Sequence, residues 1–176
     1  SAVKGEGKTI TALNIAYVMA HDFKKKVALV ECDFRMPTLS NYFSNTDGIK
    51  GIYEAIEDGA NTEEVLSRVE GTSLYVIPAL KSTSNSAKLL DSQRIKALIR
   101  SLKTDFDYVI IDSPPILHMA DMNIIARIVD GLILVVRAGK TPKDIVLKAV
   151  KSIQNVNIAG IVLNDAEVST NRYYYR

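Results

Sequence analysis

The sequence predicts an α/β fold with a doubly wound, mostly parallel sheet and helices on both of its faces. Short apolar runs, partly β-branched, alternate along the chain with stretches whose apolar residues recur at helical spacing. Such runs are typical of strands buried on both faces, and their alternation with helices is typical of right-handed βαβ units. At 176 residues, 47% of them hydrophobic, the chain is long enough for one packed domain. We therefore expect residues 1–176 to form a single domain.

The first predicted element is a helix over residues 9–21, where Ile10, Leu13 and Tyr17 follow helical spacing. Strands are predicted at 27–30, 74–78, 108–111, 132–136 and 158–163, and further helices near 51–58, 62–69, 87–102, 120–128 and 143–154. Because ligands of such sheets bind beyond the carboxyl ends of the strands, we expect the functional residues there.

The turn before the first helix has the composition of a phosphate-binding loop. Residues 1–9 read SAVKGEGKT, with Ala2 where the full pattern has its first glycine. The two glycines let backbone N–H groups curl around an anion, the helix N-terminus adds a positive dipole, and Lys8 adds a charge. Thr9 supplies a hydroxyl for Mg²⁺. Because such loops connect a strand to a helix, we expect the first strand of the sheet to lie upstream of Ser1 and the domain to be incomplete at its N-terminus.

Composition argues against several other classes of protein. The net charge is only +2, and lysines and arginines are spread along the chain, so nucleic-acid binding is not expected. The single cysteine, Cys32, cannot form an internal disulfide or a Cys-x-x-Cys metal site, and we expect it to be a small buried residue. The longest apolar runs have the length of strands and fall well short of the roughly 20 residues of a membrane span.

Two predicted strands end in carboxylates. Glu31 and Asp33 lie two residues apart after the strand over 27–30, on one side of the chain, where they can orient the waters of Mg²⁺ or accept a proton. The alternative is an acidic turn neutralised by Arg35. Asp112 ends a later strand and is placed to hold Mg²⁺ in the manner of a Walker B residue. The alternative is that Asp112 caps a turn.

Two further features lie near the end of the chain. Asn164 ends the last predicted strand, where its amide could bind an adenine edge or form a turn. Three consecutive tyrosines then occupy residues 173–175, between Arg172 and Arg176. Strand geometry would point them to alternating faces and chain termini are usually mobile, so we expect an accessible phenol cluster. A packed terminal strand or a partner-binding patch is the alternative.

Residues 5–9 (GEGKT), 31–35 (ECDFR), 112–115 (DSPP) and the terminal tyrosines together resemble the bacterial tyrosine kinases, or BY-kinases, of capsule and exopolysaccharide biosynthesis. The resemblance spans the whole chain and implies a P-loop NTPase fold. It also implies an ATP-dependent protein-tyrosine autokinase that regulates exopolysaccharide synthesis and export. In that family the three motifs are called Walker A, A′ and B, and each kinase phosphorylates the tyrosine cluster of a neighbouring copy in a ring-shaped homo-oligomer.

The resemblance implies roles for individual residues. The implied catalytic residues are Lys8, Glu31, Asp33 and Asp112, with Asp33 as the acid beside the accepting phenol, and Thr9, Asp33 and Asp112 serve Mg²⁺. The implied ATP-binding residues are Lys4, Gly5, Glu6, Gly7, Lys8, Thr9, Ile10 and Asn164. The implied phosphate acceptors are Tyr173, Tyr174 and Tyr175.

Two residues depart from the family pattern. Glu31 stands where the family usually has Asp, and its extra methylene could shift the carboxylate by about an ångström, enough to impair catalysis that depends on positioning. Lys4 stands where the family usually has Pro. The resemblance further implies a transmembrane polysaccharide chain-length or activator protein as partner. It implies a cytoplasmic location at the inner face of the membrane, through that partner or an upstream segment.

Two other functions share these features. An ATPase switch of the partitioning and cell-division type has the same sheet, phosphate loop and Asn-ended strand, but it carries a signature lysine five residues before the loop lysine. Val3 occupies that place here, and Lys4 lies one position too late. A catalytically inactive adaptor would keep the fold for partner binding, and Glu31 is the residue that suggests it.

Overall fold

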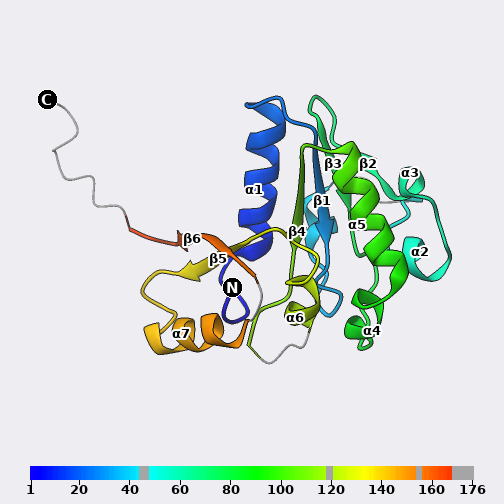
Figure 1. The fold of residues 1–176 in the computed structure, drawn as a ribbon. Helices are drawn as coiled ribbons and strands as arrows, with labels where there is room; N and C mark the ends of the chain where they lie inside the picture. The colour runs from blue at the N-terminus through cyan, green and yellow to red at the C-terminus, as the bar shows by residue number, and fades with distance from the viewer. Residues whose placement is uncertain (44–47, 118–120, 154–155, 168–176) are drawn as a thin grey trace, which may run out of the picture.

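The computed structural model in Figure 1 describes residues 1–43, 48–117, 121–153 and 156–167. Its helices are α1 (Lys8–His21), α2 (Ile52–Glu57), α3 (Thr62–Val65), α4 (Ser86–Leu90), α5 (Gln93–Asp105), α6 (Asp121–Ile125) and α7 (Lys143–Ser152), with a 3-10 turn, η1 (Leu39–Tyr42). Its strands are β1 (Val27–Glu31), β2 (Ser67–Arg68), β3 (Leu74–Ile77), β4 (Tyr108–Asp112), β5 (Leu132–Arg137) and β6 (Ile158–Asn164).

The strands form two sheets. One has the order β2-β3-β1-β4, in which β1 is parallel to both β3 and β4 and the short β2 is antiparallel to β3. The other consists of β5 and β6, which are parallel to each other. Helices α1 and α5 lie on opposite sides of the four-stranded sheet (Figure 1). The predicted doubly wound, mostly parallel fold is confirmed, although β4 and β5 do not pair among the described residues.

The core explains why the apolar runs form central strands. Every residue of β1 is buried, so its side chains pack on both faces of the sheet. Val27 and Leu29 contact a cluster with Ala16 and Ala20 of α1, whereas the alternate residues Ala28 and Val30 belong to the larger cluster that includes α5. Burial on both faces removes the polar alternation expected of a half-exposed strand.

Two predicted helices differ from the structure. The helix predicted over 62–69 ends at Val65, because residues 67–68 form β2 and pair with β3. The helix predicted over 87–102 is divided into α4 and α5, because Ser92 adopts an extended backbone and its side chain accepts a hydrogen bond from the Ile95 N–H. A serine in this position is a typical helix start.

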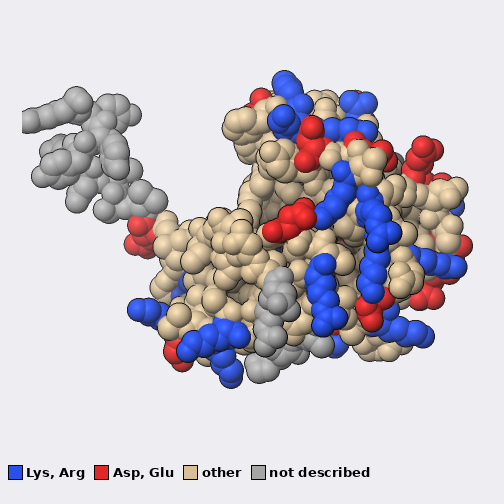
Figure 2. Space-filling view, in the orientation of Figure 1, with Lys and Arg blue, Asp and Glu red and all other residues tan. Residues whose placement is uncertain are grey.

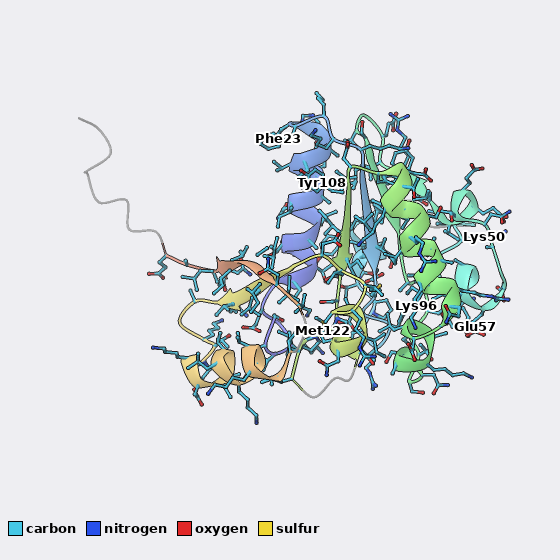
Figure 3. All side chains as sticks on the ribbon, viewed as in Figure 1. Phe23, Lys50, Glu57, Lys96, Tyr108 and Met122 are labelled. Atoms are coloured by element: carbon cyan, nitrogen blue, oxygen red, sulfur yellow. The ribbon has the colours of Figure 1, made fainter. Side chains whose placement is uncertain are left out.

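A cavity of about 290 Å³ lies between β4 and β5, lined mostly by apolar side chains of both strands and by Met122 of α6, which Figure 3 labels. Ser1 also lines the cavity and is 5% exposed. The strand predicted upstream of Ser1 lies outside the sequence and stays a prediction. Among the described residues, the helices are too short or too polar to cross a membrane.

Candidate nucleotide-binding site

The turn before α1 has the backbone shape of an anion-binding loop. Gly5 and Gly7 adopt φ values of 82° and 91°, in the left-handed region that favours glycine. Gly7 caps α1, and this cap offers no side-chain hydrogen bond to the first turn, which also lacks an acidic residue. The first N–H groups of a helix have no intrahelical acceptor, so this 14-residue helix can offer them to a phosphate.

Asp112 lies beside this turn at the carboxyl end of β4. Its partner across the parallel sheet is Glu31 of β1, and the Asp112 carbonyl accepts a 2.7 Å hydrogen bond from the Cys32 N–H. The Asp112 side chain is 2% exposed, and neither carboxylate oxygen has a hydrogen-bond partner among the described residues. Burial raises the pKa of Asp112 to about 6, an effect that the nearby Thr9 hydroxyl and Lys8 ammonium partly offset. A nearby cation would stabilise the ionised form of this buried carboxylate.

These surroundings fit Mg²⁺. Among the residues that the structure describes, no group of three or more His, Cys, Asp or Glu side chains is arranged to hold a metal ion. Mg²⁺ is usually held by one or two carboxylates together with substrate phosphates and water. Asp112 and the Thr9 hydroxyl, next to the phosphate-binding turn, can supply the protein ligands of such a site.

Asp33 follows β1 and lies at the same edge of the sheet. It is partly buried, and this burial raises its pKa, while the Lys8 charge and two backbone N–H groups act in the opposite direction. Asp33 Oδ1 accepts a 3.2 Å hydrogen bond from the Met36 N–H. Lys8 therefore acts electrostatically on both Asp33 and Asp112, and the structure brings these three predicted residues together with Thr9.

Glu31 differs from the expectation of a direct catalytic role. The side chain is fully buried, and its two oxygens accept hydrogen bonds from the backbone N–H groups of Thr38 (2.6 Å), Leu39 (2.8 Å) and Ala79 (2.9 Å). Burial raises the pKa of Glu31, although these three bonds oppose the shift. The Thr38 hydroxyl in turn donates to Thr9 Oγ1 over 3.3 Å. Glu31 therefore anchors the segments around the site instead of facing it.

The residues expected to bind ATP fall into different environments. Lys4 is exposed and Ile10 is 42% exposed, so both lie on the surface of the turn and of α1. Lys4 also lines a cavity of about 400 Å³ with Arg137, Lys140 and Lys148. Basic side chains gather over α7 in Figure 2. This positive charge beside the turn favours an anionic ligand. The Glu6 side chain is 2% exposed and points into the protein.

Asn164 ends β6 directly beneath the turn. Its Nδ2 atom donates a 2.9 Å hydrogen bond to the Glu6 carbonyl, and a Cβ atom built on Gly7 would lie 2.2 Å from that nitrogen. The Asn164 amide therefore holds the phosphate-binding turn through one of its N–H groups. This contact was not part of the expected role in binding adenine.

A second polar cluster beside Asp33 was not predicted. Arg35 Nε donates to Ser86 Oγ over 3.1 Å, and Ser86 Oγ donates to Asp121 Oδ2 over 2.8 Å. Ser86 is fully buried and Asp121 is 1% exposed. No sequence pattern links these three positions, because they come from separate segments of the chain. The predicted acceptors Tyr173, Tyr174 and Tyr175 lie outside the described residues.

Comparison of the sequence with known proteins identifies a family and several relatives. A family model described as an AAA domain matches residues 3–164. Tyrosine-protein kinase CpsD of Streptococcus agalactiae serotype III is 33% identical over 175 residues, which cover 98% of this chain and 75% of that protein. Tyrosine-protein kinase YwqD of Bacillus subtilis is 33% identical over 178 residues, which cover 99% of this chain and 73% of that protein.

A solved structure gives the same result for the fold. The kinase domain of VpsO superimposes with a TM-score of 0.87 at 30% sequence identity, over 93% of this chain and 81% of that domain. The similarity of fold therefore extends over nearly the whole of this chain.

Proposed function

The chain belongs to the bacterial tyrosine-protein kinase family, with an AAA domain over residues 3–164, and we propose that it transfers the γ-phosphoryl group of ATP to protein tyrosine. The observation that carries this proposal is the placement of four residues at one edge of the sheet. Lys8 and Asp112 line one cavity, Thr9 follows Lys8 in the first turn of α1, and Asp33 follows β1, whose last residue pairs with Asp112. The buried carboxylate of Asp112, without a hydrogen-bond partner among the described residues, is the strongest part of it.

The chemistry needs accurate placement and charge compensation. Lys8 and the N–H groups of residues 5–9 bind the β- and γ-phosphates, and Thr9 with Asp112 holds Mg²⁺. When bound, Mg²⁺ neutralises charge on these phosphates. A tyrosine phenol has an ordinary pKa of about 10 and loses its proton as it attacks. Asp33 accepts that proton, and its raised pKa makes it a stronger base than an exposed aspartate.

The physiological role follows from the family. The kinase regulates exopolysaccharide or capsule synthesis and export, and it phosphorylates Tyr173, Tyr174 and Tyr175 of a neighbouring copy within a homo-oligomer. Its partner is a transmembrane activator protein, which keeps it at the inner face of the membrane. The relatives named tyrosine-protein kinase at 33% identity favour this function over an ATPase switch.

The test is autophosphorylation of the full-length protein in Mg²⁺-ATP. We expect phosphotyrosine in the unaltered protein, none in Lys8→Ala, and an undiminished signal in Lys25→Ala, a matched change at an exposed lysine between α1 and β1. Mass spectrometry should place the phosphate on residues 173–175, and replacing the three tyrosines by Phe should remove most of it. ATP hydrolysis without phosphotyrosine would support the ATPase switch instead.

A further inference from the structure

The side chain of Glu6 is buried although it belongs to a short surface turn whose neighbours Lys4 and Gly5 are exposed. Glu6 Oε2 accepts a 2.7 Å hydrogen bond from the Val3 N–H within the turn. Glu6 Oε1 accepts a 2.6 Å bond from the Thr141 hydroxyl and a 3.4 Å bond from the Arg137 N–H. The carboxylate therefore joins the phosphate-binding turn to the segment between β5 and α7.

Two more hydrogen bonds connect the phosphate-binding turn to β5 and β6. The Glu6 carbonyl accepts the bond from Asn164, and the Gly5 carbonyl accepts a 3.4 Å bond from Arg137 Nη1. Arg137 is itself held by an ion pair in which Nη2 lies 2.6 Å from Asp165 Oδ2. The ends of β5 and β6 thus hold both the side chain and the backbone of the turn.

On its other side the turn is attached to the segment after β4. The Ile116 N–H donates to the Ser1 carbonyl over 2.8 Å, and the Leu117 N–H donates to the Ala2 carbonyl over 3.1 Å. Because β4 and β5 do not pair among the described residues, the turn bridges the two sheets. Its shape therefore depends on contacts at both ends.

We propose that Glu6 is a positioning residue that clamps the phosphate-binding turn to Thr141 and Arg137 and so keeps its backbone N–H groups in the shape that binds nucleotide phosphates. This role rests on the proposed function only in assuming that the turn binds a nucleotide. Glu6 itself does not contact the nucleotide through its side chain. A preformed turn avoids the ordering that a mobile loop would undergo on binding.

The chemistry of the clamp requires a carboxylate. Each of its two oxygens accepts a backbone N–H, Oε2 from Val3 and Oε1 from Arg137. A glutamine at this position has only one acceptor oxygen. In either orientation of its amide, the N–H₂ group would face a backbone N–H, and two donors cannot form a hydrogen bond with each other. Burial alone would raise the pKa of Glu6, but the bonds from Thr141, Val3 and Arg137 hold it below its ordinary value.

The experiment measures binding of a fluorescent ADP analogue to the full chain with Mg²⁺, alongside unfolding in urea. We expect Glu6→Gln to weaken binding by about tenfold, the effect of one lost charge-assisted hydrogen bond. Thr141→Val should weaken it in the same direction, and Thr141→Ser, which keeps the hydroxyl, should restore it. Glu57→Gln is the matched control, because Glu57 is exposed on α2, away from α7 in Figure 3.

Pairing the two changes separates a clamp from independent effects. If Glu6 acts through Thr141, the double variant Glu6→Gln/Thr141→Val should bind about as weakly as Glu6→Gln alone. Unchanged affinity in Glu6→Gln, or two effects that simply multiply, would overturn the clamp. If Glu6→Gln does not fold, the clamp is tested by Thr141→Val and Thr141→Ser alone. Equal nucleotide affinity in these two variants would overturn it. If the unaltered chain does not bind the nucleotide, both the clamp and the proposed function are overturned. If it binds and Glu6→Gln binds equally well, only the clamp is overturned.

Discussion

Replacing Asp112 by Asn should make the nucleotide-free protein more stable at neutral pH while abolishing its activity. Asp112 is 2% exposed, and its pKa is raised from an ordinary value of 3.8 to about 6. Ionising this side chain in the folded protein therefore costs free energy that the unfolded chain does not incur. A rise from 3.8 to about 6 corresponds to about 3 kcal/mol.

The sign follows from proton binding. Between pH 3.8 and about 6 the folded protein holds the Asp112 proton more tightly than the unfolded chain does, so this residue lowers stability as pH rises through that range. Below it the carboxyl is neutral in both states, and above it the full cost is present. Asp112→Asn cannot ionise, so its advantage over the unaltered protein should grow from about 0.5 kcal/mol at pH 4 to about 3 kcal/mol at pH 7.

The assay is urea unfolding of both proteins without Mg²⁺ or nucleotide from pH 4 to pH 8, with the difference in free energy of unfolding plotted against pH. Asp105→Asn, at the exposed end of α5, is the matched control and should give a difference that stays small across the range. If the difference in free energy of unfolding between Asp112→Asn and the unaltered protein does not rise from pH 4 to pH 7, burial does not destabilise the ionised form of Asp112.

Three further predictions follow from the contacts around the site. Both glycines have a positive φ, so either alanine strains the turn, but Gly7→Ala also places a methyl group against Asn164 Nδ2, whereas Gly5→Ala meets no atom within 4 Å. Calorimetric titration should therefore show a larger loss of nucleotide affinity for Gly7→Ala, and equal losses would contradict this. Glu31→Ala leaves three backbone N–H groups without their acceptor and should lower the free energy of unfolding in urea by about 3 kcal/mol; a loss below about 1 kcal/mol would be inconsistent with an anchoring role. Ser92→Ala removes the cap of α5 and should cost about 1 kcal/mol in the same assay, and no loss would show that the cap is dispensable.

The fold was predictable because its main signals are local. The continuous apolar run of β1 reflects burial on both faces, and the alternation of such runs with helices sets the topology. The start of α5 was missed, because the apolar spacing on either side of Ser92 favoured one continuous helix, whereas the Ser92 side chain accepts a hydrogen bond from the Ile95 N–H. The two residues of β2 had no local signal, because their extended conformation depends on pairing with β3.

The site was predictable only in part. Lys8, Thr9 and Asp112 belong to short patterns whose chemistry requires those residue types together, so sequence could bring them to one edge of the sheet. The environment of Glu31 could not be inferred, because one of its hydrogen-bond donors, Ala79, lies 48 residues away. The bond between Glu6 and Thr141 spans 135 residues. Contacts of this kind arise from packing and leave no periodic trace in the sequence.

The measurement that tests the central claim most directly is a crystal structure of the protein with Mg²⁺ and a non-hydrolysable ATP analogue. We expect the triphosphate within the turn of residues 5–9, beside Lys8, and the metal ion between Thr9 and Asp112 with Asp33 facing the γ-phosphate. A nucleotide bound elsewhere, or a metal ion that contacts neither Thr9 nor Asp112, would contradict the proposed site.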